Sequence, residues 1–304
     1  MPKILLTGAA GFVGRTLLAE AGGVHEWIAL DLGFPEGWSP GAAVSESIVS
    51  DLSDPDALRG IVRRSRADAV VHLAGWTGKG GSVENRSKLL VANLVSTWNL
   101  LDAIISSGTP KPQFLLASSA LVYGNQPGPF RETFETRPLD EYAFTKWLAE
   151  EVVRSGARSD AVIPTVIRPG VIYGPGQGGT MFVPSLAKAL ARAEPFAMTS
   201  GVQKRDLIHV RDVAGAILAL LASRAEGVFN VGTGAGIPMI EIGQKMAELA
   251  GRPDLLRAGE LPYRENEVWE YVVDSTRLAE ATGWAPRISL DAGLEETLKK
   301  EMNR

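Results

Sequence analysis

A tyrosine and a lysine one helical turn apart are the residues in this sequence best suited to proton transfer. Tyr142 and Lys146 stand at positions i and i+4 of a segment, Leu139–Arg154, whose pattern predicts a helix, so both side chains project from one face. A free phenol has a pKa near ~10, too high for a base at neutral pH, and a nearby ammonium lowers it. Ser119 could hydrogen-bond the same substrate oxygen. Such a trio could take a proton from a hydroxyl while hydride leaves its carbon.

A glycine-rich segment near the N-terminus predicts where the hydride acceptor binds. The letters TGAAGFVG place Gly8, Gly11 and Gly14 between an expected strand, Lys3–Thr7, and an expected helix, Phe12–Ala21. Gly8 would allow a tight turn, and Gly11 would let the backbone approach a pyrophosphate at the helix N-terminus. Gly14 would permit close helix–strand packing. The spacing therefore predicts a dinucleotide-binding loop, whose oxidised nicotinamide would also stabilise a phenolate.

Acidic residues follow two later strands. Asp31 closes the expected strand Glu26–Asp31, 17 residues after the last glycine of the loop. Its carboxylate could accept both ribose hydroxyls of adenosine and would repel a 2′-phosphate. Leu32–Phe34 follow without an arginine, so the sequence favours NAD over NADP. Asp51, after the third strand, could accept from the adenine amino group; for both aspartates the alternative is a turn-forming role.

Buried strands alternate with longer helices around these residues, and Asp54 before Pro55 has the pattern of a helix start. The expected strands are Lys3–Thr7, Glu26–Asp31, Ala69–Leu73, Gln113–Ser118, Val162–Arg168 and Val228–Val231. The expected helices are Phe12–Ala21, Asp54–Arg64, Glu84–Ser106, Leu139–Arg154, Met181–Arg192, Val213–Ala222, Met239–Ala250 and Asp291–Met302.

This alternation predicts an α/β fold, a Rossmann-type doubly wound parallel sheet with a smaller C-terminal substrate-binding lobe. We expect residues 1–168 to form the dinucleotide-binding domain, with residues 206–231 returning to it. Residues 169–205 and 232–304 would form the lobe over the carboxyl edge of the sheet, which is where ligands bind in doubly wound folds. Trp76, after the fourth strand, could line the substrate pocket.

Composition argues against several other kinds of site. The 31 Lys and Arg residues against 35 Asp and Glu give a net charge of −4. The chain therefore has no excess of positive charge that would favour binding to nucleic acid or an anionic membrane. The absence of cysteine excludes disulfides, thiolate metal ligands and cysteine nucleophiles, and three scattered histidines argue against a metal site. The longest apolar stretch with a helical pattern, Val213–Ala222, is shorter than the ~18–20 residues of a membrane span, so we expect a cytoplasmic protein.

Further motifs are spread along the chain. They are DLSD (51–54), HLAG (72–75), NLVSTWNLL (93–101), SSALVYG (118–124), YAFTK (142–146), RPGVIYGPG (168–176), RDLIHVRDVA (205–214), FNVGTG (229–234) and DSTRLAEATGWAP (274–286). With the glycine loop and Asp31, they resemble the extended short-chain dehydrogenase/reductase family, the NAD-dependent sugar-nucleotide epimerases and dehydratases. The resemblance covers nearly the whole chain and implies NAD as cofactor and a nucleotide sugar as substrate.

The resemblance also implies roles for individual residues. Asn93 would support Ser119, Tyr142 and Lys146, while Arg205 and Arg264 would grip the nucleotide diphosphate, for which arginine is well suited. Besides the glycines, the two aspartates, Tyr142 and Lys146, the cofactor would contact Ala10, Phe12, Val13, Leu52, Leu73, Ala74, Gly75, Asn93, Ser118, Pro169 and Val171. The substrate would contact Trp76, Ser119, Ala120, Tyr142, Arg205 and Arg264.

Three departures from the family pattern narrow the function. Ala120 and Leu121 stand where the 4,6-dehydratases carry Asp-Glu, which argues against dehydration. Val171 replaces an asparagine that touches the sugar diphosphate in many relatives. The segment Pro262–Glu267 looks more like that of 4-ketoreductases acting on nucleotide-linked deoxysugars.

Several functions therefore stay open. The first is an NAD-dependent sugar-nucleotide 4-epimerase acting through a transient 4-keto sugar, and the second is an NAD(P)H-dependent 4-ketoreductase of an NDP-4-keto-6-deoxysugar. A dehydrogenase of a free sugar acid or polyol is a further enzyme alternative. A non-catalytic NAD sensor is disfavoured because such proteins typically lose the tyrosine or the lysine. Since the helices Glu84–Ser106 and Leu139–Arg154 pair across a two-fold axis in relatives, we expect a homodimer.

Overall fold

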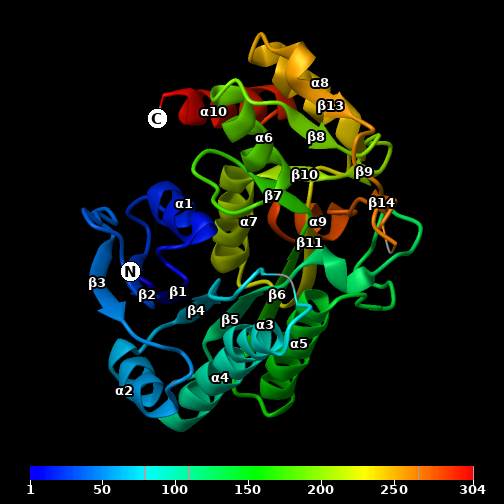
Figure 1. Cartoon of the computed structure of the whole chain (residues 1–304). Coiled ribbons are helices and arrows are strands. Elements are labelled where there is room, and N and C mark those ends of the chain that lie inside the picture. The colour runs from blue at the N-terminus through cyan, green and yellow to red at the C-terminus, as the bar shows by residue number, and fades with distance from the viewer. Residues whose placement is uncertain (79, 109, 266, 304) are drawn as a thin grey trace.

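A seven-stranded parallel sheet forms the centre of the molecule (Figure 1). The computed structural model describes residues 1–78, 80–108, 110–265 and 267–303. The strand order is β11-β6-β5-β4-β1-β2-β3, and every neighbouring pair is parallel. The strands are β1 (Lys3–Thr7), β2 (Glu26–Asp31), β3 (Val44–Val49), β4 (Ala69–His72), β5 (Gln113–Ala117), β6 (Ile163–Pro169) and β11 (Gly227–Val231). The order reverses between β1 and β4, which creates the switch point where doubly wound folds bind ligands.

Helices cover both faces of this sheet and create two separate cores. One core lies under α1 (Phe12–Glu20) and α7 (Val210–Ser223), and the other under α2 (Pro55–Ser65), α4 (Ser96–Ser107) and α5 (Glu141–Arg158). Side chains alternate between the two faces along each strand, so Ile4 and Leu6 of β1 enter the first core and Leu5 enters the second. All three are buried, as expected for a parallel sheet covered on both faces.

The helix expected over Glu84–Ser106 is interrupted. It consists of α3 (Val83–Leu89), a π-helical turn (Leu90–Val95) and α4. Asn93 lies inside the π-helical turn, which is the kind of local irregularity often found at functional sites. The periodicity of the sequence predicted the helix but not the wider turn within it.

The same segment corrects the expectation about apolar helices. Among the described residues, Val83–Ser107 is one helical stretch of 25 residues, and its most apolar window has a mean hydropathy of 1.5. This apolar helical stretch is longer than Val213–Ala222, which was expected from the sequence to be the longest. By length and composition alone it could cross a membrane. However, 44% of that window is buried in this fold, and core helices of globular proteins pass the same test.

A smaller lobe with its own core stands above the carboxyl edge of the sheet (Figure 1, top). Its helices are α6 (Phe182–Ala191), α8 (Met239–Leu249) and α10 (Leu290–Met302), with the paired strands β8 (Phe196–Met198) and β13 (Leu256–Ala258). The remaining described elements are short. They are β7 (Val171–Tyr173), β9 (Lys204–Arg205), β10 (Leu207–His209), β12 (Ile237–Pro238), β14 (Glu270–Tyr271), α9 (Thr276–Thr282) and the 3₁₀ turns η2 (Ala120–Tyr123) and η3 (Pro253–Leu255).

The expected strands and helices of the central sheet agree with the structure to within a few residues. The predicted start of α2 is confirmed, since Asp54 Oδ1 accepts from Asp56 N at 3.0 Å and from Ala57 N at 3.1 Å. Strand β3 is the third strand expected before Asp51, but its bounds were not predicted because it is an edge strand with exposed polar residues (VSESIV) and no apolar run. The two- and three-residue strands are too short to produce a periodic pattern.

Candidate active site

The loop between β1 and α1 has room for glycine alone at two of its three glycine positions. Gly8 has a φ of +73°, and a Cβ there would lie 2.6 Å from Ala74 N. A Cβ on Gly14 would lie 2.2 Å from the carbonyl oxygen of Gly8, so α1 starts as close to the strand as the sequence predicted. Because α1 begins here with free backbone N–H groups, this loop fits the pyrophosphate of a dinucleotide.

Asp31 holds this loop from the neighbouring strand. Its Oδ2 accepts from Ala10 N and its Oδ1 accepts from Leu32 N, both at 2.8 Å. Each carboxylate oxygen retains acceptor capacity, so ribose hydroxyls could still bind. Asp51 is exposed and closes a turn by accepting from Ser53 N at 2.8 Å, while Leu52 is buried.

Tyr142 and Lys146 lie on one face of α5, as predicted, and both meet the chain that leaves β5. Asp140 caps the N-terminus of this helix, because its side chain accepts from Ala143 N at 2.7 Å, and Tyr142 therefore lies in the first turn. Ser119 lies close enough to Tyr142 to lower the pKa of its phenol. Lys146 is buried, and its Nζ donates to the carbonyl oxygen of Ala117 at 2.8 Å. The three predicted catalytic side chains are therefore brought together.

Burial dominates the ionisation of this pair. It raises the pKa of Tyr142 to about 12, with Asp140 acting in the same direction and the neighbouring Ser119 side chain opposing it. It lowers the pKa of Lys146 to about 8, against the effect of the Glu150 carboxylate. The lowered phenol pKa expected from the neighbouring lysine is thus absent in the protein by itself, because the cost of burying a phenolate is larger.

Asn93 connects α5 to the loop that follows β4. Its Oδ1 accepts from Trp76 N at 2.8 Å, and its Nδ2 donates to the Trp76 carbonyl at 3.1 Å and to Thr145 Oγ1 at 3.0 Å. A Cβ on Gly75 would lie 2.8 Å from Asn93 Oδ1 and 3.2 Å from Lys146 Nζ. The absence of a side chain at Gly75 thus lets Asn93 and Lys146 approach the backbone of this loop closely.

The two arginines expected to grip a diphosphate come from the lobe side. Arg205 Nη1 donates to the Val268 carbonyl at 2.7 Å, and its guanidinium forms an ion pair with Glu267. Burial lowers the pKa of Arg205, and the nearby charge of Arg264 acts in the same direction. Arg264 itself is exposed. Of the segment Pro262–Glu267, Asn266 lies outside the described residues.

The remaining predicted contacts surround this centre. Trp76 is half-buried, Ser118 and Ala120 are buried, and Val171 packs against both the lobe core and the small apolar cluster around Ala120. Pro169 ends β6. No three histidine, aspartate or glutamate side chains of the described residues gather in a way that could hold a metal ion.

Comparison with known proteins agrees with this geometry. A model of the NAD dependent epimerase/dehydratase family matches residues 4–232. The chain belongs to this family. It is 27% identical to dTDP-L-rhamnose 4-epimerase of Burkholderia thailandensis, over 97% of this chain and 93% of that protein. It is 29% identical to GDP-6-deoxy-D-mannose reductase of Pseudomonas aeruginosa, over 97% of this chain and 96% of the relative. Among solved structures it is similar to MoeE5 in complex with UDP-glucuronic acid and NAD, with a TM-score of 0.86, 31% identity and 98% of both chains covered.

Two residues of this epimerase/dehydratase-family site were not predicted. Tyr271 is buried on β14; its hydroxyl lies 3.5 Å from Ser119 Oγ and donates to the Pro169 carbonyl at 3.3 Å. Only the pairing of β14 with β9 brings it there, and no sequence spacing relates it to Ser119. His72, the first residue of the HLAG motif, bridges Thr7 Oγ1 at 2.7 Å and Thr97 Oγ1 at 3.0 Å. Burial, with Lys146 nearby, lowers its pKa to about 3, so the imidazole is neutral.

Proposed function

We propose that this protein is an NAD-dependent nucleotide-sugar C4 oxidoreductase that works as a 4-epimerase through a transient 4-keto sugar. The observation that carries the proposal is the meeting of Ser119, Tyr142 and Lys146 beside a glycine loop shaped for a dinucleotide. Relatives that are 4-epimerases, and a similar structure holding both a UDP-sugar and NAD, support it.

The residues divide the reaction between them. Bound NAD supplies the hydride acceptor and, when oxidised, a positive charge that lowers the pKa of a neighbouring phenol. Tyr142 Oη accepts the proton of the 4-hydroxyl as C4 loses its hydride, and returns it when the hydride comes back to the opposite face of the ketone. Ser119 holds the reacting oxygen, and protonated Lys146 stabilises the phenolate.

Substrate recognition is assigned to the lobe side. Arg205 and Arg264 would bind the nucleotide diphosphate, with Glu267 exchanging its place on Arg205 for a phosphate. Trp76 and Ala120 would line the sugar pocket. Residues 1–168 and 206–231 would bind NAD, for which Asp31 provides the preference over NADP, and residues 169–205 and 232–304 would bind the substrate.

We also propose that the protein is a cytoplasmic homodimer. The helical segment Val83–Ser107 and α5 expose apolar side chains that an interface would cover, including Trp98 at 60% exposure and Phe144 at 45%. Sedimentation at micromolar concentration tests this, and a clean monomer would contradict it.

The second candidate is a 4-ketoreductase, favoured by the reductase relative and by the segment Pro262–Glu267. Anaerobic incubation with UDP-, dTDP-, CDP- and GDP-linked sugars separates the two, with absorbance at 340 nm and product NMR as readouts. The epimerase forms a C4 epimer without net consumption of NADH. Stoichiometric consumption of NADH with a 4-keto sugar would instead establish the reductase.

A further inference from the structure

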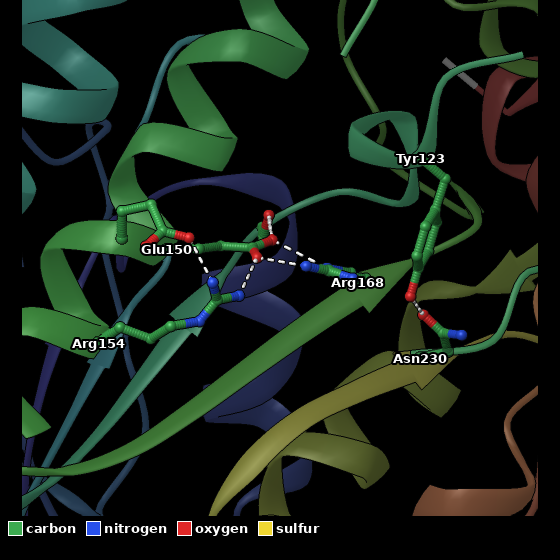
Figure 2. Close-up of polar contacts among 7 residues, drawn as sticks. Tyr123, Glu150, Arg154, Arg168 and Asn230 are labelled. Atoms are coloured by element: carbon green, nitrogen blue, oxygen red, sulfur yellow. Dashed lines mark hydrogen bonds and ion pairs between the residues drawn. The ribbon is translucent and has the colours of Figure 1, made fainter. Parts of the chain in front are cut away.

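A buried ion pair lies directly behind the proposed catalytic residues, and the mechanism above does not use it. Glu150 of α5 is fully buried, and Arg168 of β6 is 2% exposed. Arg168 donates from Nη2 to Glu150 Oε2 at 2.5 Å and from Nε to Glu150 Oε1 at 3.0 Å, which is a bidentate contact. Figure 2 shows Arg154 reaching the same carboxylate from the opposite side, at 3.5 Å.

Glu150 continues the face of α5 that carries Tyr142 and Lys146. The three positions are four residues apart, so their side chains project in one direction. Each of them lies next to one of three consecutive residues at the end of β5. Lys146 Nζ donates to the Ala117 carbonyl at 2.8 Å, and Ser118 Oγ donates to Glu150 Oε1 at 2.5 Å. Ser119 lies near Tyr142 and lowers the pKa of its phenol. The carboxylate therefore fixes the central residue of the chain segment that presents Ser119.

Arg168 is itself held in place from the other side. Its guanidinium carbon lies 4.7 Å from the centre of the Tyr123 ring, a cation–π distance. Tyr123 Oη donates to Asn230 Oδ1 at 2.8 Å (Figure 2). Asn230 Nδ2 donates in turn to the Phe130 carbonyl at 2.8 Å. Arg168 Nη1 is buried and has no hydrogen-bond partner among the described residues. Glu150 is thus the group that balances this buried positive charge.

The carboxylate of Glu150 is also one of the charged groups around Lys146. Burial lowers the pKa of Lys146 to about 8, and the carboxylate of Glu150 acts in the opposite direction. His72 of β4 faces the lysine as a neutral imidazole, and Tyr142 faces it from α5 as a neutral phenol. Arg168 of β6 and Arg154 of α5 are the cations on the far side of Glu150. Buried ion pairs can often be replaced by apolar residues without loss of stability. A contribution to stability therefore does not by itself explain the presence of the Glu150–Arg168 pair.

We propose that Glu150 is a positioning residue for the proposed reaction: anchored by Arg168, it holds Ser118 and keeps Lys146 protonated beneath Tyr142. Its effect on turnover rests on the proposed function, whereas its effect on Lys146 does not. Arg168 holds the carboxylate in place.

The test is an NMR titration of protein labelled with ¹³C at lysine Cε, with Lys146→Met to assign the resonance. Glu150→Gln removes the anion and leaves Arg168 unpaired, so the Lys146 midpoint is expected to fall by at least about one pH unit. Arg168→Met breaks the same ion pair but keeps the anion, so the midpoint is expected to stay or rise. A purely structural pair gives the same midpoint in both variants as in the wild type, which would overturn the proposal.

A second variant covers the case in which a single substitution prevents folding. Glu150→Met with Arg168→Met removes both charges and leaves neither unpaired, which proteins often tolerate. The Lys146 midpoint is expected below that of the wild type, and an unshifted midpoint would overturn the proposal. If the protein turns over a nucleotide sugar, the pH above which kcat/KM decreases is also expected to be lower in Glu150→Gln than in the wild type, in step with the Lys146 midpoint. If the wild type turns over no nucleotide sugar, the proposed function fails while the titration still decides the role of Glu150.

Discussion

The cofactor side and the substrate side of the site are built in different ways. On the cofactor side, Asn93, Lys146 and His72 are buried and lie in the helical segment Val83–Ser107, in α5 and in the central strand β4. On the substrate side, Arg205 lies on a two-residue strand and Arg264 is exposed. The proposed chemistry thus rests on a preorganised frame, and recognition rests on short segments that can differ between relatives.

The ion pairs of the two sides show the same contrast. Glu150 and Arg168 are held by several hydrogen bonds and are 0% and 2% exposed. Arg205 and Glu267 are 17% and 10% exposed, and in the proposed function a phosphate takes the place of the carboxylate. A fixed pair suits a role in positioning, whereas a partly exposed pair can exchange its partner.

The largest expected effect is the loss of turnover in Tyr142→Phe, on the cofactor side of the site. Turnover is expected to fall at least ~10²-fold because the general acid–base group is removed while the ring remains. Tyr173→Phe is the matched control, since among the described residues that hydroxyl makes one hydrogen bond, to the Leu290 carbonyl at 3.5 Å. Steady-state kinetics of both variants measure the difference, and unchanged turnover in Tyr142→Phe would contradict the whole catalytic assignment.

The buried imidazole of His72, on the cofactor side, is expected to make the free energy of unfolding depend on pH. Its pKa is about 3 in the folded protein against 6.5 as an ordinary value, so between these values the unfolded chain binds a proton that the folded chain does not. This residue therefore stabilises the fold above pH 6.5 and loses that contribution as the pH falls, by about 2 kcal/mol between pH 7 and pH 5.

We expect the gap in unfolding free energy between wild type and His72→Asn to narrow by that amount over this range. Urea denaturation at the two pH values measures it. A gap independent of pH would show that the imidazole does not remain neutral in the fold.

The smallest expected effect is a change in KM for a nucleotide sugar, caused by substitutions on the substrate side of the site. Arg205→Met is expected to raise KM for a nucleotide sugar about tenfold with little change in kcat, because it removes one charged contact to the diphosphate. Arg264→Met is expected to have a smaller effect because Arg264 is exposed. Arg59→Met, on the surface of α2, is the control. A KM untouched in both site variants would favour the dehydrogenase of a free sugar acid or polyol.

The same contrast explains what the sequence could predict. The bounds of β1 and β2 follow from short buried apolar runs, and the glycine loop follows from steric requirements of the backbone. Tyr142 and Lys146 were found because helical spacing places them on one face. Tyr271 and the polar bridge of His72 depend on contacts between residues distant in the chain, for which spacing gives no signal. Glu150 lies on the predicted face of α5, but its role depends on Arg168 from β6.

The most direct test of the central claim uses the nucleotide sugar that the protein turns over, prepared with deuterium at C4. If Tyr142 serves an oxidation and reduction at the same carbon, the product is the C4 epimer, it retains deuterium at C4, and no NADH accumulates or is consumed. Loss of the deuterium to solvent, or a C4 epimer formed with hydrogen from added NADH, would contradict the account.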